Sequence, residues 1–144
     1  ARPASVSAAT PAGAKISGGA ETILLVDDDA SAREFALAVL QKDGYRVLQA
    51  GCGAEALEVW AWHSSRIDLL LTDMVMPNRP TGLELAAKLR AEKPALKVIC
   101  ISGYNRETMD RFSAPSAEMQ FMQKPYRPQD LAREVREILD RKTP

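Results

Sequence analysis

The 144-residue sequence contains only two cysteines, one histidine and no excess of charge of either sign. Cys52 and Cys100 fall in different predicted elements and form no CxxC pair, so we expect free thiols in a reducing compartment. His63 is the only histidine, which excludes a histidine-rich metal cluster. Basic and acidic residues both number 19, so neither nucleic acid nor a membrane surface is favoured as the main partner.

Long apolar runs are also missing. No segment approaches the roughly 20 apolar residues of a membrane-spanning helix, so we expect no direct membrane insertion. The first twenty residues consist mainly of Ala, Ser, Pro and Gly and contain no apolar core of a signal peptide. We expect 1–20 to be a flexible linker or tail and 21–142 to be a single domain. The chain does not begin with Met, which is consistent with an excerpt from a longer polypeptide.

From residue 21 onward, strand and helix signals alternate. Apolar or mixed runs predict strands at 23–26, 45–50, 68–72, 97–101 and 119–123. Capping-box patterns predict helices that begin at Ser31 and at Thr81. Further helices are expected at 54–63, from Asn105 over a short stretch, and around the stripe formed by Leu131, Val135, Ile138 and Leu139.

This alternation indicates an α/β sandwich in which helices cover both faces of a parallel sheet. The strands at 23–26, 68–72 and 97–101 are almost wholly apolar, as central strands are. The strands at 45–50 and 119–123 have mixed polarity, which is typical of edges. The pattern fits a flavodoxin-like (βα)5 three-layer sandwich with strand order 2-1-3-4-5.

The stretch LLLTDMVMP at 69–77 places a lone aspartate, Asp73, within an apolar run. An ionised carboxylate is costly to bury without a partner. In such a sheet, ligands bind beyond the carboxyl ends of the strands. The polar residues expected at that edge are Asp27, Asp28 and Asp29 after the first strand, Asp73 after the third, Ser102 with Gly103 after the fourth, and Lys124 after the fifth.

Carboxylates gathered at one edge would repel one another unless a cation lay between them. Mg²⁺ or Mn²⁺, which prefer oxygen ligands, would fit. With a cation and Lys124 beside it, Asp73 becomes a carboxylate nucleophile suited to a phosphoryl group. Structural roles compete with this interpretation. Aspartates after a strand often cap the next helix, and we favour that role for Asp29. Phe121 alone is equally well explained as core.

Residues 21–142 resemble the receiver domain of the two-component response-regulator family. The resemblance rests on ILLVDDDA, LLTDMVMP, VICISGY and FMQKPY, which follow one another in the family's order and spacing. It implies that Asp73 is the phosphoacceptor, that Ser102 and Lys124 contact the phosphoryl oxygens, and that Lys124–Pro125 is cis. It also implies that Asp28, Asp73 and the backbone carbonyl of Val75 bind the metal ion directly and that Asp27 binds it through water. Met74 and Gly103 would line the phosphoryl pocket. Ser102 and Phe121 would form the switch pair.

The resemblance further implies partners. Phosphoryl transfer would come from a phosphohistidine on a sensor histidine kinase or a histidine phosphotransfer protein. It would change the face made by the fourth helix, fifth strand and fifth helix, with a phosphorylation-dependent homodimer as one outcome. The SGY and QKPY forms and the Ala/Pro-rich leader resemble receivers of hybrid sensor histidine kinases, on the cytoplasmic side of a bacterial sensor. A free-standing regulator stays open. We expect no turnover enzyme and no nucleic-acid binding.

Two other functions remain open at this point. A haloacid-dehalogenase-type phosphohydrolase carries DxD after its first strand, and Asp27 would then be the nucleophile. Ala30 stands where that family has Gly-Thr, which argues against it. A receiver-like module that docks without phosphorylation is the second alternative, and the complete set of acidic pair, serine and lysine argues against it. Two departures from the receiver pattern are a loop at 76–82 that is one residue longer and an irregular stretch at 105–118.

Overall fold

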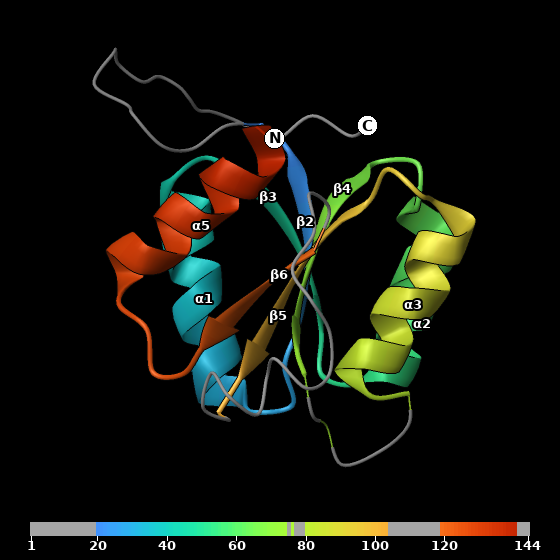
Figure 1. The fold of residues 1–144 in the computed structure, drawn as a ribbon, viewed down its shortest axis with the longest axis horizontal. Helices are drawn as coiled ribbons and strands as arrows, with labels where there is room; N and C mark the ends of the chain where they lie inside the picture. The colour runs from blue at the N-terminus through green and yellow to red at the C-terminus, as the bar shows by residue number, and fades with distance from the viewer. Residues whose placement is uncertain (1–19, 75, 77–79, 104–118, 141–144) are drawn as a thin grey trace.

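The computed structural model describes residues 20–74, 76, 80–103 and 119–140. These residues form the strands β2 (Thr22–Val26), β3 (Arg46–Ala50), β4 (Ile67–Asp73), β5 (Lys97–Ser102) and β6 (Met119–Gln123). They also form the helices α1 (Ala30–Lys42), α2 (Gly53–His63), α3 (Gly82–Glu92) and α5 (Pro128–Asp140) (Figure 1). Residues 1–19 of the linker expected at 1–20, and the short helix expected from Asn105, lie outside the described residues.

The five described strands form one parallel sheet in the order β3-β2-β4-β5-β6. Counted along the chain, this is the predicted order 2-1-3-4-5, so the flavodoxin-like architecture is confirmed. The buried strands β2, β4 and β5 occupy the centre, and the two strands of mixed polarity occupy the edges. Apolar content therefore predicted strand position, because central strands of such a sheet are covered on both faces.

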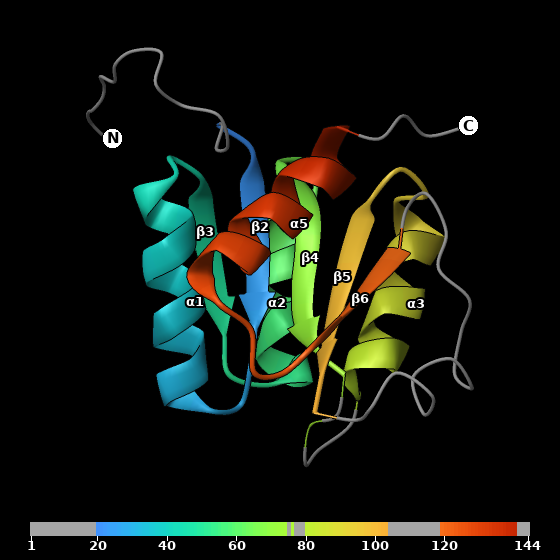
Figure 2. The ribbon, with the colours of Figure 1, turned by 60° about the vertical axis from the view of Figure 1, so that its left-hand side comes forward.

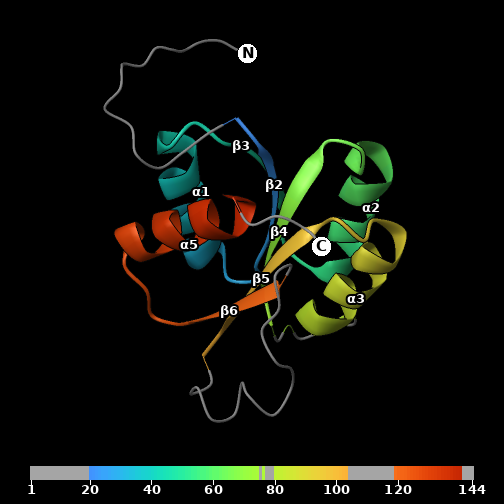
Figure 3. The same cartoon turned by 45° about the horizontal axis from the view of Figure 1, so that its top comes forward.

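Helices cover both faces of the sheet and create two hydrophobic cores. Helices α1 and α5 lie on one face, and α2 and α3 lie on the other (Figures 2 and 3). Alternate residues of the central strands point into opposite cores. In β2, for example, Leu24 belongs to the core under α2 and α3, whereas Ile23 and Leu25 belong to the core under α1 and α5. In the three central strands, polar residues lie near the strand ends and the middle is apolar.

The start of α1 differs from the prediction. Asp29, not Ser31, is the N-cap, and its Oδ1 accepts hydrogen bonds from the main-chain N–H groups of Ser31 and Ala32. The helix consequently begins at Ala30 and turns Ala36 and Leu40 inward. Phe35, on the same helix, is 40% exposed. The capping role expected for Asp29 is confirmed.

The capping box at Thr81 and the apolar stripe on α5 are confirmed, and Gly44 and Trp60 add two further local features. Thr81 and Glu84 form a complete capping box at the start of α3. Gly44 has φ 97°, the left-handed conformation that ends a helix most readily at glycine. Trp60 is buried and donates to Glu92 Oε1 at 2.9 Å, which joins α2 to α3. The stripe on α5 faces the core as expected.

Candidate phosphoacceptor site

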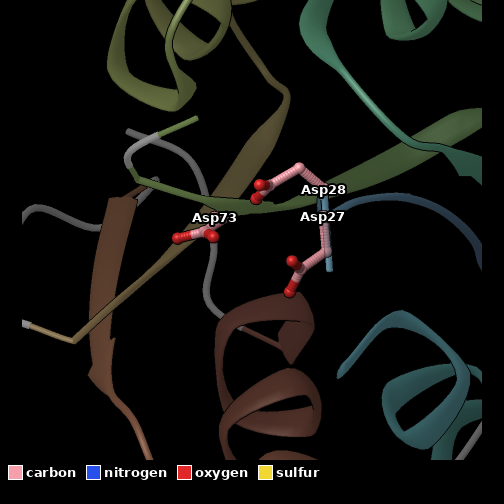
Figure 4. Close-up of side chains that lie close together, drawn as sticks. All are labelled: Asp27, Asp28 and Asp73. Atoms are coloured by element: carbon pink, nitrogen blue, oxygen red, sulfur yellow. The ribbon is translucent and has the colours of Figure 1, made fainter. Parts of the chain in front are cut away.

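The register between two central strands brings the acidic residues together. In the parallel pairing of β2 with β4, Val26 lies opposite Thr72, and one residue further along each strand come Asp27 and Asp73. Both strands end side by side at the same edge of the sheet, at the bottom of the view in Figure 2. The carboxylates of Asp27 and Asp28 turn toward the side on which Asp73 lies (Figure 4). The strand termini alone therefore create an acidic cluster.

Asp27, Asp28 and Asp73 can each offer a carboxylate oxygen such that the three atoms lie within 4.8 Å of one another. Their environments differ, since Asp27 is buried, Asp73 is half-buried and Asp28 is exposed. The cluster thus opens to solvent on the Asp28 side and rests on the sheet on the Asp27 side. Hereafter these three residues are called the acidic cluster.

Lys124 supplies positive charge to this cluster. It follows β6 directly, and its main-chain N–H donates to Ser102 O at 2.7 Å. Its Nζ lies 3.4 Å from Asp27 Oδ2 and 3.5 Å from Asp73 Oδ2. Burial lowers the pKa of Lys124, but the negative charges of Asp27 and Asp73 outweigh burial and leave the pKa raised. Lys124 is therefore a fixed cation at neutral pH.

Two further groups respond to the same charges. Burial, together with the charges of Asp27 and Asp73, raises the pKa of the Tyr126 hydroxyl to about 12. Burial and the charge of Asp73 likewise raise the pKa of the Cys100 thiol to about 12. Both side chains stay protonated and uncharged at neutral pH. Cys100 is a free thiol, as expected, and it is buried in the core beneath the site.

The remaining predicted site residues lie around this group. Ser102 ends β5 and is buried, and the exposed Gly103 follows it. Met74 is buried, and its N–H donates to Ile101 O at 2.7 Å. Phe121 is partly buried in the middle of β6 and packs against the core under α2 and α3. Val75, whose carbonyl the resemblance implied as a metal ligand, lies outside the described residues. The Lys124–Pro125 peptide is cis, as the resemblance implied.

Three contacts near the cluster were not predicted. Arg33 Nη1 donates to the main-chain carbonyl of Asp27 at 2.6 Å. The hydroxyl of Thr72 donates to the main-chain carbonyl of Asp73 at 2.9 Å. Gly82 lies so close to Asp73 that a Cβ atom built on the glycine would be 1.8 Å from the Asp73 carbonyl oxygen. No local sequence signal identifies these contacts, because each joins a side chain or Cα to a main-chain group whose position is set by the folded chain.

The donor set is suited to a divalent metal ion. Three carboxylates face one ammonium group, so negative charge exceeds positive charge among these four side chains. All the ligand atoms that the acidic cluster offers are hard oxygens, which Mg²⁺ and Mn²⁺ prefer. The residues present therefore fit the cation that the sequence predicts.

Comparison with known proteins identifies the family. The sequence model of the response regulator receiver domain family matches residues 23–136, so the chain belongs to this family. It is similar to the sensor kinase CckA of Brucella abortus (strain 2308), with 35% identity over 123 residues, covering 85% of this chain but only 13% of that protein. The response regulator receiver protein CpdR of the same organism is 34% identical over 117 residues, covering 81% and 95% of the two chains.

A solved structure supports the same family assignment. The crystal structure of the receiver domain from the hybrid histidine kinase CckA superimposes with a TM-score of 0.70 and 33% identity. It covers 83% of this chain and 99% of that one. Residues 23–136 are accordingly a receiver domain of the two-component systems, a family of phosphoacceptor modules in signal transduction.

These matches favour neither of the two alternative functions. Receiver domains generally bind Mg²⁺, and the acidic cluster of this chain has the matching donor set. Among the described residues, every helix is too short or too polar to cross a bilayer.

Proposed function

We propose that Asp73 is the residue that accepts the phosphoryl group, with Asp27, Asp28 and Asp73 holding one Mg²⁺ ion. The observation that carries this proposal is the convergence of the three carboxylates within 4.8 Å, with the ammonium of Lys124 3.5 Å from Asp73. Asp73 stands at the end of a buried strand and is half-buried, so its carboxylate is held in place yet reachable. Asp28 and Asp73 are the direct ligands in this proposal, and Asp27 acts through water.

Positive charge is the main chemical requirement of phosphoryl transfer, because the transferred group carries negative oxygens throughout. A Mg²⁺ ion held by the acidic cluster would supply part of that charge. Lys124 supplies another part, and its raised pKa keeps it protonated at neutral pH. The Ser102 hydroxyl, at the end of the neighbouring strand, donates a hydrogen bond to a phosphoryl oxygen. The Val75 carbonyl, outside the described residues, remains the proposed fourth protein ligand.

The reaction is a transfer from a partner's phosphohistidine. A carboxylate oxygen of Asp73 forms the new bond to phosphorus as the bond from phosphorus to the histidine nitrogen breaks. The leaving nitrogen keeps the electron pair, and no external oxidant or reductant takes part. The end of β4 holds Asp73 in position. The Thr72 hydroxyl donates to the main-chain carbonyl of Asp73, and the main chain of Gly82 lies close to the same carbonyl. Holding the nucleophile in one position lowers the entropic part of the barrier.

Phosphorylation is then communicated to the surface. Movement of Ser102 toward the phosphoryl group leaves space that Phe121, two strand positions before the end of β6, can enter. Because Phe121 is only partly buried, rotation of its ring requires no opening of the core. The result is a shift between two packings of the face that includes β6 and α5. A phosphorylation-dependent homodimer is one use of that face.

The donor in this proposal is a sensor histidine kinase or a histidine phosphotransfer protein. The similarity to the receiver of CckA, a hybrid histidine kinase, supports a chain that is the cytoplasmic receiver of a larger sensor. CpdR, a receiver protein of nearly the same length as the match, supports the free-standing alternative. The domain would catalyse its own phosphorylation and dephosphorylation without turning over an external substrate.

Incubation with Mg²⁺ and acetyl phosphate tests the proposal. Intact-mass spectrometry is expected to detect one phosphoryl adduct on the wild type and none on Asp73→Asn. Asp29→Asn is the matched control, because asparagine caps a helix as well as aspartate does, and the adduct should persist. Omission of Mg²⁺ should abolish the adduct. An adduct that survives Asp73→Asn contradicts the assignment.

A further inference from the structure

Arg33 lies in the first turns of α1, and its side chain reaches back across the turn that follows β2. Its Nη1 donates to the main-chain carbonyl of Asp27 at 2.6 Å. A hydrogen bond from a charged guanidinium is stronger than one between neutral groups. The bond therefore ties the helix to the strand end from which two members of the acidic cluster project.

The guanidinium is confined by its surroundings. A Cβ atom built on Gly51 would lie 3.4 Å from Nη1 of Arg33 and 3.4 Å from Oε1 of Glu55. Glu55 is itself fixed, because its Oε1 accepts from Gly51 N–H at 2.6 Å. Arg33, Gly51 and Glu55 line a hollow of about 170 Å³ together with Gln49 and Ala50. Arg33 thus sits between the ends of β2 and β3 and the start of α2.

Arg33 completes the fixation of Asp27. The Asp27 N–H donates to Ala50 O at 3.2 Å, and Oδ1 accepts from Asp29 N–H at 2.9 Å. Oδ2 lies 3.4 Å from the ammonium of Lys124. The carbonyl is the fourth polar group of this residue, and Arg33 holds it. Without Arg33, the peptide that joins Asp27 to Asp28 would lose the hydrogen bond that the guanidinium donates to its oxygen.

We propose that Arg33 is a positioning residue for the metal site: it acts through the Asp27 carbonyl to keep both β2 carboxylates directed at Asp73. The inference rests on the proposed function, since it presumes that the cluster binds Mg²⁺. It predicts that loss of Arg33 weakens cation binding without removing any ligand.

Isothermal titration calorimetry with Mg²⁺ alone tests this inference on the wild-type chain, Arg33→Gln and Arg33→Lys. We expect Arg33→Gln to weaken Mg²⁺ binding about tenfold, the scale of one charge-assisted hydrogen bond. Arg33→Lys keeps the charge but lacks the planar fork, so we expect a loss of about threefold. Phosphorylation by acetyl phosphate should recover to the wild-type rate at saturating Mg²⁺, because the nucleophile and Lys124 are untouched.

Arg90→Gln is the matched control. Arg90 Nη2 also donates to a main-chain carbonyl, that of Pro94 at 3.2 Å, but at the far end of α3. We expect its Mg²⁺ affinity to equal that of the wild type. Equal affinities of Arg33→Gln and wild type, or an equal loss in Arg90→Gln, overturn the inference while the proposed function stands. If Arg33→Gln does not fold, as judged by melting in EDTA, Arg33→Lys decides between the same outcomes. A wild type that binds no Mg²⁺ overturns the proposed function itself.

Discussion

Replacement of Gly82 by alanine would place a methyl group against the phosphoacceptor strand. The new Cβ would lie 1.8 Å from the Asp73 carbonyl oxygen, 2.8 Å from its carbonyl carbon and 2.9 Å from Met74 Cα. Separations under 3.0 Å are essentially never seen for real Cβ atoms, so α3 and the end of β4 must part by about 1.2 Å. All three obstructing atoms belong to the main chain, and none can rotate away. The Gly82 N–H bond to Met74 O, 3.1 Å long, would be strained as well.

Overpacking of this kind costs about 1–3 kcal/mol, and a main-chain obstacle places the cost toward the upper end. Urea denaturation should therefore show Gly82→Ala destabilised by about 2–3 kcal/mol. Displacement of a nucleophile by about 1 Å can cost about 100-fold in rate, so acetyl phosphate should label the variant far more slowly where it is still folded. Gly103→Ala is the stability control, because a Cβ at that position meets no atom within 4 Å. Wild-type stability and labelling rate in Gly82→Ala would refute the reasoning.

Three further predictions concern charge and burial. Lys124→Gln should tighten Mg²⁺ binding several-fold in calorimetry, because the ammonium competes with the metal ion for the carboxylates. The same variant should be phosphorylated more slowly, because the ammonium also stabilises the phosphoryl group. Weaker Mg²⁺ binding in this variant would contradict the prediction. Glu21 pairs with Arg136 at 2.9 Å, and hydrogen bonding to Arg136 lowers the pKa of Glu21 below 4.5. Its contribution is present above that pH and lost as pH falls through the lowered value, so Glu21→Gln should cost up to about 1 kcal/mol at pH 7 and nothing near pH 2. Trp60→Phe should lower the free energy of unfolding by about 1–3 kcal/mol, because the hydrogen bond to Glu92 is lost. Trp62→Phe should change it by less than about 0.5 kcal/mol, because Trp62 is 84% exposed.

The sheet was predictable because a strand that is buried on both faces has a continuous run of apolar residues. Leu69, Leu70 and Leu71 are fully buried, and no polar residue interrupts them before Thr72 and Asp73. The edge strand β3, by contrast, contains the exposed polar residues Arg46 and Gln49 among apolar ones. This mixed polarity identified it as an edge strand. Parallel strands end at one edge, so the grouping of polar residues after several strands predicted the location of the site.

The start of α1 was less predictable. Asp29 and Ser31 are both good N-cap residues, and local sequence cannot choose between them. The choice is made by the turn after β2, in which Asp29 N–H donates to Asp27 Oδ1. Phe35 lies at the surface, where the centroid of its ring is 5.8 Å from that of Tyr126. Tertiary contacts of this kind override local capping patterns.

The contacts to main-chain carbonyls were beyond sequence analysis altogether. Arg33 precedes Glu34 on an exposed stretch of helix, where an arginine is ordinarily explained as a solvated residue. Its role depends on the distance from α1 to the Asp27 carbonyl, which only the folded chain determines. The close approach of Gly82 to Asp73 depends likewise on the path of the loop between β4 and α3.

Chemical mapping of the phosphorylated residue tests the central claim most directly. Borohydride reduces an aspartyl phosphate to homoserine, which peptide mass spectrometry can assign to one position in the chain. After treatment with Mg²⁺ and acetyl phosphate, homoserine should stand at position 73 alone. Homoserine at position 27 would instead indicate the dehalogenase-type nucleophile, and its absence from both positions would show that these carboxylates accept no phosphoryl group.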